Sequence, residues 1–373
     1  GGKLILRIED TDQSRKIEDA TTKIISTFKK LNIQFDEGPE KDGGNGPYFQ
    51  SRRLDIYQQY IQILLDNNDA YPCFCSSEQL EEVRKQQSEN KQTIKYDRHC
   101  MGLTSEEANI KMANESYVIR MQIPGDEEIV FYDMVRGEIV FSCEEIDDQV
   151  LIKSDGYPTY HFANVIDDHL MQISHVIRGE EWIASMPKHI LLYQYYDWKI
   201  PQFIHLPLIL NKDKTKLSKR QNDVAVEDYI NNGYLKETMI NYLSLLGWHG
   251  SGDRELYSID ELIKEFSIER IQKSGAIFDI KKLNWMNNHY IKQLNSKELF
   301  DLSKKFISTQ KKINQDMINL ICEKIERLID IPKELDFFFN SKLENDECFS
   351  IINTETSQRI IKKLLLLIQN NKK

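Results

Sequence analysis

The chain has 373 residues and a formal net charge of −10, from 49 Lys and Arg against 59 Asp and Glu. This length is enough for two or three hydrophobic cores. The acidic balance argues against a generally basic nucleic-acid-binding protein but leaves room for a local basic face. No apolar run approaches the length that spans a bilayer. Six cysteines without a signal-like start favour a reducing compartment, where thiols stay free or bind a metal.

The first predicted element is a strand over residues 4–8, and the mainly acidic run of residues 9–12 follows it at once. A helix is expected over residues 17–31. Carboxylates before a helix are typical of an N-terminal capping cluster. Residues 36–50 form a Gly-rich loop without a phosphate-binding pattern, and a second helix is expected over residues 51–67.

Three cysteines in the next segment have the spacing of a metal site. Cys73 and Cys75 form a C-x-C pair, and Cys100 follows a charged helix expected over residues 78–89. Thiolates in this pattern are ligands of structural zinc, and the alternative is three free thiols. His99 is chemically suited to be a fourth ligand, but adjacent residues rarely reach one ion together.

Residues 104–150 are predicted to form a mixed segment between two α/β halves. Alternating apolar residues predict strands over residues 117–124, 128–134 and 137–141. The segment is therefore expected to be an insertion in a larger α/β domain.

Residues 153–182 carry the highest density of chemically active side chains. Tyr160 and Asn164 are four apart and share a face if they lie on a helix. A short strand is expected over residues 173–177, and Arg178 follows it. A guanidinium at the carboxyl end of a strand can form a two-pronged bond to a carboxylate, although an Arg with nearby Glu residues is more often a surface ion pair.

The remaining chain is expected to be mostly helical. A strand is predicted over residues 203–210, and His205 within it is expected to have a structural role, not a catalytic one. A basic loop follows at residues 216–220. Such a loop alone is more typical of a solvated basic surface than of phosphate binding. After residue 226 the sequence predicts helices. An amphipathic stripe of isoleucine and leucine at residues 318–328 indicates a buried face.

Three motifs together resemble the bacterial-type glutamyl-tRNA synthetases, a family of class I aminoacyl-tRNA synthetases. Residues 7–12 match RIEDTD, residues 216–220 match the KMSKS loop in its KLSKR form, and residues 153–182 match the stretch between them. The resemblance covers nearly the whole chain. It implies an α/β fold with a Rossmann-type parallel sheet, an inserted α+β connective domain, and a helical stem-contact and anticodon-binding region.

The same resemblance implies a division of the chain into domains. The expected parts are residues 1–67 and 161–225 for the catalytic domain, residues 68–160 for the connective insertion, residues 226–295 for stem contact and residues 296–373 for part of the anticodon-binding domain.

The activity that the resemblance implies is ATP-dependent attachment of L-glutamate to tRNA(Glu) through glutamyl-adenylate, with Mg²⁺ accompanying ATP. The partners are therefore glutamate, ATP and tRNA, with no membrane, and the chain is expected to be a monomer. The implied glutamate site comprises Glu9, Tyr160, His161, Phe162, Ala163, Asn164, Arg178 and Trp182. The implied ATP site comprises Glu181, Lys216, Leu217, Ser218, Lys219 and Arg220, with Lys216 and Lys219 as the catalytic residues. The implied zinc ligands are Cys73, Cys75, Cys100 and Tyr96.

The chain departs from the family pattern at its start. The family's HIGH motif precedes RIEDTD, so we expect the first strand-loop-helix upstream of Gly1, and the anticodon-binding region is expected to continue past Lys373. The alternative function is therefore a catalytically incomplete tRNA-binding or regulatory protein. Residues 219–224 look more like mitochondrial members, which predicts the mitochondrial matrix, with the bacterial cytoplasm as the second choice.

Overall fold

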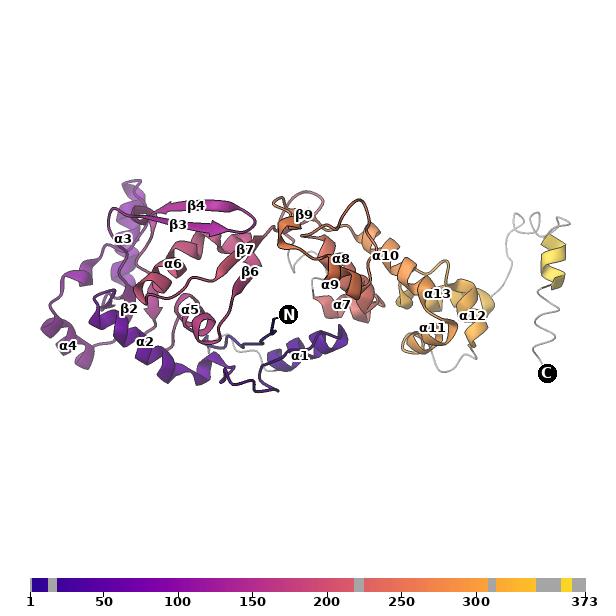
Figure 1. Ribbon diagram of the computed structural model, residues 1–373, viewed down its shortest axis with the longest axis horizontal. Coiled ribbons are helices and arrows are strands. Elements are labelled where there is room, and N and C mark those ends of the chain that lie inside the picture. Colours follow the sequence, from indigo (N-terminus) through magenta and orange to yellow (C-terminus); the bar gives the residue numbers. More distant parts are fainter. Residues whose placement is uncertain (1, 13–18, 218–224, 308–312, 340–356, 364–373) are drawn as a thin grey trace. The chain divides into compact units, whose positions relative to one another are not determined.

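The computed structural model describes residues 2–12, 19–217, 225–307, 313–339 and 357–363. The chain divides into two compact units. The first unit comprises residues 1–229 and 236–280, and the second comprises residues 230–235 and 281–373. Figure 1 shows the elements of both.

A four-stranded sheet forms the centre of the first unit. In Figure 1, β3 and β4 run side by side, and β7 and β6 continue the sheet in the order β4-β3-β7-β6. The three strands β3, β7 and β6 are parallel, whereas β4 is antiparallel to β3. The hairpin that we assigned to the insertion thus extends the parallel sheet, and the sheet is mixed. The strands are β3 (Glu128–Asp133), β4 (Gly137–Ser142), β6 (His175–Gly179) and β7 (Gln202–Leu206).

Two strand predictions are corrected in position. The strand expected over residues 173–177 is β6, which begins at His175, so Arg178 lies within the strand and not after it. The strand expected over residues 203–210 is divided into β7 and β8 (Ile209–Leu210). Pro207 lies in the break, where its missing amide hydrogen would interrupt a ladder.

A second, antiparallel sheet has the strand order β1-β2-β5. It consists of β1 (Ala70–Cys73), β2 (Val118–Met121) and β5 (Val150–Ile152). Because β1 ends at Cys73, the sheet fixes the first of the clustered cysteines. A short parallel pair joins β8 to β9 (Ala276–Ile277).

Helices cover one face of the four-stranded sheet. Side chains from α2, α5 and α6 pack with Ile129, Phe131 and Phe203 in one hydrophobic cluster. Ile204 alternates to the other face of β7 and joins a separate cluster with Trp248. The helices of this unit are α1 (Ala20–Lys30), α2 (Leu54–Asp66), α3 (Ser77–Glu89), α4 (Ser105–Asn114), α5 (Tyr160–Leu170), α6 (Met186–Tyr195), α7 (Val226–Asn231, as far as Tyr229), α8 (Lys236–Leu245) and α9 (Ile259–Glu265).

The expected strand at residues 4–8 is an extended segment with two parallel bridges, Ile5 to Glu37 and Ile8 to Phe49. The predicted helices at residues 51–67 and 78–89 are confirmed as α2 and α3. Among the described residues, none of the helices combines the length and the apolar character that a membrane crossing needs.

The second unit is helical in the part that is described. The stripe at residues 318–328 is buried as predicted, but α12 ends at Ile321, so Ile325 and Leu328 reach the core from the turns that follow. The helices of this unit are α10 (Ile280–Gln293, from Lys281 onward), α11 (Ser296–Ser303), α12 (Gln315–Ile321) and α13 (Ile331–Leu335).

Candidate functional site

A cavity of about 310 Å³ lies between the extended residues 5–9, α5 and β6. We call it the β6 cavity. It brings together four of the residues predicted for the amino-acid site, Glu9, Tyr160, Asn164 and Arg178. Its full lining is Ile5, Leu6, Arg7, Glu9, Tyr160, Asn164, Asp168, Met171, Ile173, Val176, Ile177 and Arg178.

A chain of polar contacts runs along this cavity and starts from Arg7. The Arg7 guanidinium lies 3.5 Å from the Glu9 carboxylate, 2.9 Å from Asp168 Oδ1, and donates to Asn164 Oδ1. Asn164 Nδ2 donates in turn to the Tyr160 hydroxyl at 3.0 Å. Burial raises the pKa of Glu9, although Arg7 opposes this. The Glu9 side chain is also 41% exposed, so its carboxylate is open to an ammonium group.

Arg178 closes the other end of the cavity and is held by neutral groups. Its Nε donates to His205 Nε2 at 3.2 Å, and its Nη1 lies 3.4 Å from the Tyr160 hydroxyl. Both terminal nitrogens lie 3.5 Å from His189 Nδ1, and Nη2 contacts Met186 Sδ. Within the described parts of the chain, none of these partners is a carboxylate, so the guanidinium charge is left for a ligand.

Two other predicted residues stand beside the cavity. The Trp182 ring lies 4.5 Å from the Tyr160 ring and 5.6 Å from the Arg178 guanidinium, which makes it a wall of the site. His161 Nδ1 is 3.0 Å from His189 Nε2. Burial, together with the charges of Lys188 and Arg178, lowers the pKa of His161 to about 4.

Phe162 and Ala163 occupy a different environment. Both side chains are fully buried in the cluster between α5, α6 and the sheet, and neither lines the β6 cavity. The walls of the β6 cavity therefore include neither of these two predicted residues.

The sequence analysis missed the residues that hold this site in place. Asp167 accepts hydrogen bonds from Arg53, Tyr57 and Gln50 at 2.7–3.0 Å and lies 3.6 Å from Arg7. The available signal was a pair of adjacent carboxylates, Asp167 and Asp168, in the same helix as Tyr160 and Asn164. Its partners are more than 100 residues away and leave no local pattern.

The predicted ATP residues are only partly described. Lys216 Nζ forms an ion pair with Glu181 Oε1 at 3.1 Å, and Leu217 donates its amide to the Ile209 carbonyl at 2.9 Å. The start of the basic loop is thus tied to β8 and to the turn after β6. Ser218, Lys219 and Arg220 lie outside the described residues.

The three predicted cysteine ligands converge. The sulfur atoms of Cys73, Cys75 and Cys100 lie within 4.8 Å of one another, and Cys75 Sγ is 3.6 Å from Cys100 Sγ. The Tyr96 hydroxyl lies 3.3 Å from the sulfur atoms of both Cys73 and Cys75. Ligands on a tetrahedral zinc ion are separated by roughly 3.8 Å for sulfur pairs. This donor set fits a zinc ion, and the group of ligand atoms within 4.8 Å of one another does not include a ring nitrogen of His99.

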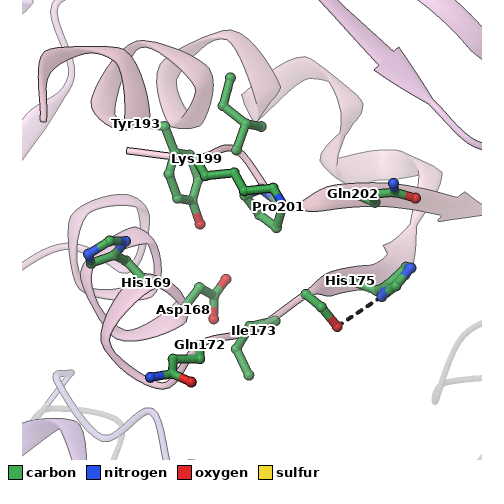
Figure 2. Close-up of a pocket in the computed structure, with 11 residues that line it drawn as sticks. Asp168, His169, Gln172, Ile173, His175, Tyr193, Lys199, Pro201 and Gln202 are labelled. Carbon is green, nitrogen blue, oxygen red and sulfur yellow. Dashed lines mark hydrogen bonds between the residues drawn. The ribbon is translucent and has the colours of Figure 1, made fainter. Parts of the chain in front are cut away.

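A second cavity, of about 490 Å³, lies at the amino ends of β6 and β7. Figure 2 shows Asp168 and Tyr193 directed into it, with Lys199 and Gln202 on the β7 side. Parallel sheets bind ligands at the carboxyl ends of their strands. The β6 cavity, which reaches Arg178 near the end of β6, is therefore the better candidate site.

Comparisons with known proteins identify the family of the chain. Residues 1–285 match the family described as the catalytic domain of class I tRNA synthetases (E and Q). The chain is 48% identical over 365 residues to a glutamate–tRNA ligase of Clostridioides difficile, covering 92% of this chain and 74% of that protein. A second such ligase, from Alkaliphilus metalliredigens, is 45% identical over 372 residues, covering 94% and 76%.

Two solved structures are similar over most of the chain. The glutamate–tRNA synthetase of Elizabethkingia anophelis gives a TM-score of 0.86 at 35% identity, covering 96% of this chain and 79% of that one. A glutamate–tRNA ligase from Elizabethkingia meningosepticum, solved in complex with its amino acid, gives 0.85 at 34% identity, covering 98% and 79%. The chain therefore belongs to the glutamate–tRNA ligases, within the class I tRNA synthetases.

Proposed function

We propose that the β6 cavity binds L-glutamate and that Arg178 receives its side-chain carboxylate. The observation that carries this proposal is the guanidinium of Arg178, which faces the cavity with neutral partners only among the described residues. A carboxylate would pair with it in a two-pronged geometry. The neutral amide of glutamine would leave the charge unpaired, so the site prefers glutamate.

At the other end of the cavity, Glu9 is proposed to bind the α-ammonium group. Its pKa is raised because the carboxylate is desolvated and Arg7 compensates only in part. An ammonium ion would add a second positive charge beside this carboxylate. Arg7 and Asn164 orient this end through their mutual hydrogen bond. The α-carboxylate of the substrate is then left free as the nucleophile.

The reaction proposed for this site needs no side-chain nucleophile. An oxygen of the α-carboxylate attacks the α-phosphorus of ATP, pyrophosphate leaves, and glutamyl-adenylate forms; the terminal hydroxyl of tRNA(Glu) then attacks the acyl carbon and AMP leaves. Catalysis rests on positioning and charge stabilisation. Lys216 stands beside Glu181 at the start of the basic loop and would meet the phosphates with Lys219, and Mg²⁺ would accompany ATP.

The cysteine cluster is proposed to bind one structural zinc ion. Cys73, Cys75 and Cys100 would supply thiolates, and Tyr96 would supply the fourth ligand. Closed four-ligand sites stabilise a fold and leave no open position for chemistry. Residues 226–295 and 296–373 remain proposed as the stem-contact and anticodon-binding regions.

The test is ATP–pyrophosphate exchange with tRNA(Glu) present, for glutamate and for glutamine. The parent chain is expected to prefer glutamate. Arg178→Gln should lose about 2–3 kcal/mol of substrate binding, roughly a 30- to 160-fold fall in kcat/KM for glutamate. Arg178→Lys keeps the positive charge but cannot form the two-pronged bond. Its kcat/KM for glutamate should therefore lie between the values of the parent chain and of Arg178→Gln.

Arg84→Gln, which removes an exposed arginine of α3, is the control and should match the parent chain. An Arg178→Gln variant with parental kinetics would exclude Arg178 as the carboxylate partner. A parent chain that binds tRNA but shows no glutamate-dependent exchange would instead support the catalytically incomplete protein.

A further inference from the structure

Arg178 is supported from the neighbouring strand by a histidine that does not line the β6 cavity. Arg178 and His205 are direct partners across β6 and β7, and Arg178 Nε donates to His205 Nε2 at 3.2 Å. His205 is completely buried. It shares a face of β7 with Phe203, and β3 places Asp133 opposite Phe203. Three adjacent parallel strands thus bring Arg178, His205 and Asp133 together near their carboxyl ends.

The chemistry of the contact fixes the protonation of the imidazole. A guanidinium can only donate, so His205 Nε2 must accept and the ring proton must sit on Nδ1. Nδ1 lies 2.7 Å from Asp133 Oδ2, which is the acceptor that this tautomer needs. The imidazole is therefore a neutral link between a carboxylate and a guanidinium.

Asp133 is itself fixed by the turn that joins β3 to β4. Its Oδ1 accepts the backbone amides of Val135 at 2.9 Å and Arg136 at 2.7 Å, and its Oδ2 accepts the amide of His205 at 3.1 Å. Burial opposes ionisation of Asp133, but the bond from His205 and these amides outweigh it and lower its pKa. The carboxylate thus holds the His205 tautomer in place.

We propose that Asp133 and His205 are positioning residues that hold the Arg178 guanidinium for a substrate carboxylate and so set the preference for glutamate over glutamine. The proposal rests on the proposed function of Arg178. Holding Nε leaves the two terminal nitrogens to meet the ligand. Their contacts to Tyr160 and His189 are long, and the Met186 sulfur that Nη2 contacts is a weak acceptor. A flexible side chain that is fixed beforehand loses less entropy on binding.

The link also explains why Arg178 stays available for an anion. A carboxylate in direct contact would neutralise the guanidinium and weaken its demand for a charged ligand. Here the carboxylate of Asp133 acts through a neutral ring. The arrangement fixes the orientation of Arg178 without pairing its charge.

The first measurement is the ratio of kcat/KM for glutamate to that for glutamine, in ATP–pyrophosphate exchange by the full chain with tRNA(Glu). This ratio does not depend on the fraction of correctly folded protein. In His205→Ala we expect it to fall at least tenfold, mainly through a higher KM for glutamate. His205→Gln returns an acceptor for Arg178 Nε and should recover part of the loss.

Asp133→Asn tests the other end of the link. An asparagine can donate to His205 Nδ1 and so move the ring proton to Nε2, where it opposes the Arg178 N–H. The ratio is expected to fall further than in His205→Gln. His175→Ala, which removes an exposed histidine from the start of β6, should keep the parental ratio.

A second readout is independent of activity. In the parent chain, the nitrogen chemical shifts of His205, assigned by comparison with His205→Gln, should show a protonated Nδ1 and an unprotonated Nε2. The opposite tautomer would overturn the proposal, as would an unchanged ratio in both His205→Ala and Asp133→Asn. If His205→Ala does not fold, His205→Gln and Asp133→Asn still decide the question. A parent chain without any glutamate-dependent exchange would instead contradict the proposed reaction and support the catalytically incomplete protein, while the tautomer of His205 would still test the link to Arg178.

Discussion

At the scale of single residues, the β6 cavity has a positive charge at one end and a carboxylate at the other. Arg178 is a cation with neutral partners among the described residues, and Glu9 is a carboxylate whose pKa burial raises. A zwitterionic ligand with a second carboxylate matches both ends. The arrangement therefore has a consequence for pH dependence.

Glutamate binding should weaken on acidification because of Glu9. Its pKa is above the usual value, so Glu9 takes up a proton at a higher pH than an ordinary glutamate does, and the protonated form no longer attracts an ammonium ion. The KM for glutamate is expected to rise several-fold, up to about tenfold, as the pH falls from 7 to 5. Steady-state exchange kinetics at constant ionic strength measure this.

Glu9→Gln serves as the comparison for this profile. The variant is neutral at every pH, so its KM should be high already at pH 7 and should change little on acidification. Parallel profiles for the parent chain and the variant would show that another group controls the pH dependence.

At the scale of elements, buried charges tie α2, α5 and the extended residues 5–9 together. Asp167 on α5 is completely buried and accepts from Arg53 and Tyr57 of the α2 region, and Arg7 approaches from the extended segment. Such a network orients the cavity wall as well as stabilising the fold. Removing one member leaves its partners buried without compensation.

Asp167→Asn is expected to destabilise the first unit by about 3–5 kcal/mol, because Arg53 is 2% exposed and would lose its counter-charge. Tyr57→Phe, which removes one hydrogen bond to the same carboxylate, should cost only about 1–3 kcal/mol. Denaturant unfolding followed by circular dichroism compares them. Equal losses in the two variants would contradict the role given to the charge.

The cysteine cluster yields a prediction about metal content. We expect about one zinc ion per chain by atomic emission, loss of that ion in Cys100→Ser, and a lower Tm of the parent chain after chelation. Cys143→Ser removes a buried thiol outside the cluster and should keep the zinc. A zinc-free parent chain with a Tm unaffected by chelator would favour three free thiols.

At the scale of the whole molecule, the chain has two compact units, and the second has its own buried core. Gly233 belongs to the second unit and has a φ of 87°, and an added Cβ would lie 2.6 Å from the backbone nitrogen of Leu328. Glycine is required there both by conformation and by space. The position therefore reports on the packing of that unit.

Gly233→Ala is expected to destabilise the protein by about 2–4 kcal/mol, from left-handed strain and displacement of the Leu328 backbone. Gly252→Ala shares the positive φ of 78° but meets no atom within 4 Å, so about 1 kcal/mol is expected. Thermal unfolding gives both values. A Gly252→Ala variant as unstable as Gly233→Ala would assign the whole effect to strain.

The sequence by itself determined the elements and the motifs. Apolar periodicity placed α2 and a charged run placed α3, each within a few residues, and the RIEDTD and KLSKR patterns together indicated the family that the comparisons later showed. Spacing also grouped Cys73, Cys75 and Cys100 correctly. These signals are local, because periodicity and motif chemistry act over a few residues. The compartment stays a prediction.

Only the tertiary structure decided how Arg178 is held. Asp133 and His205 are 72 residues apart, and their contact depends on strand order and register, which no local pattern encodes. The same holds for Asp167 and Arg53, 114 residues apart. The one-residue difference between facing the cavity and facing the core, as for Asn164 against Ala163, was settled by packing of α5 against the sheet.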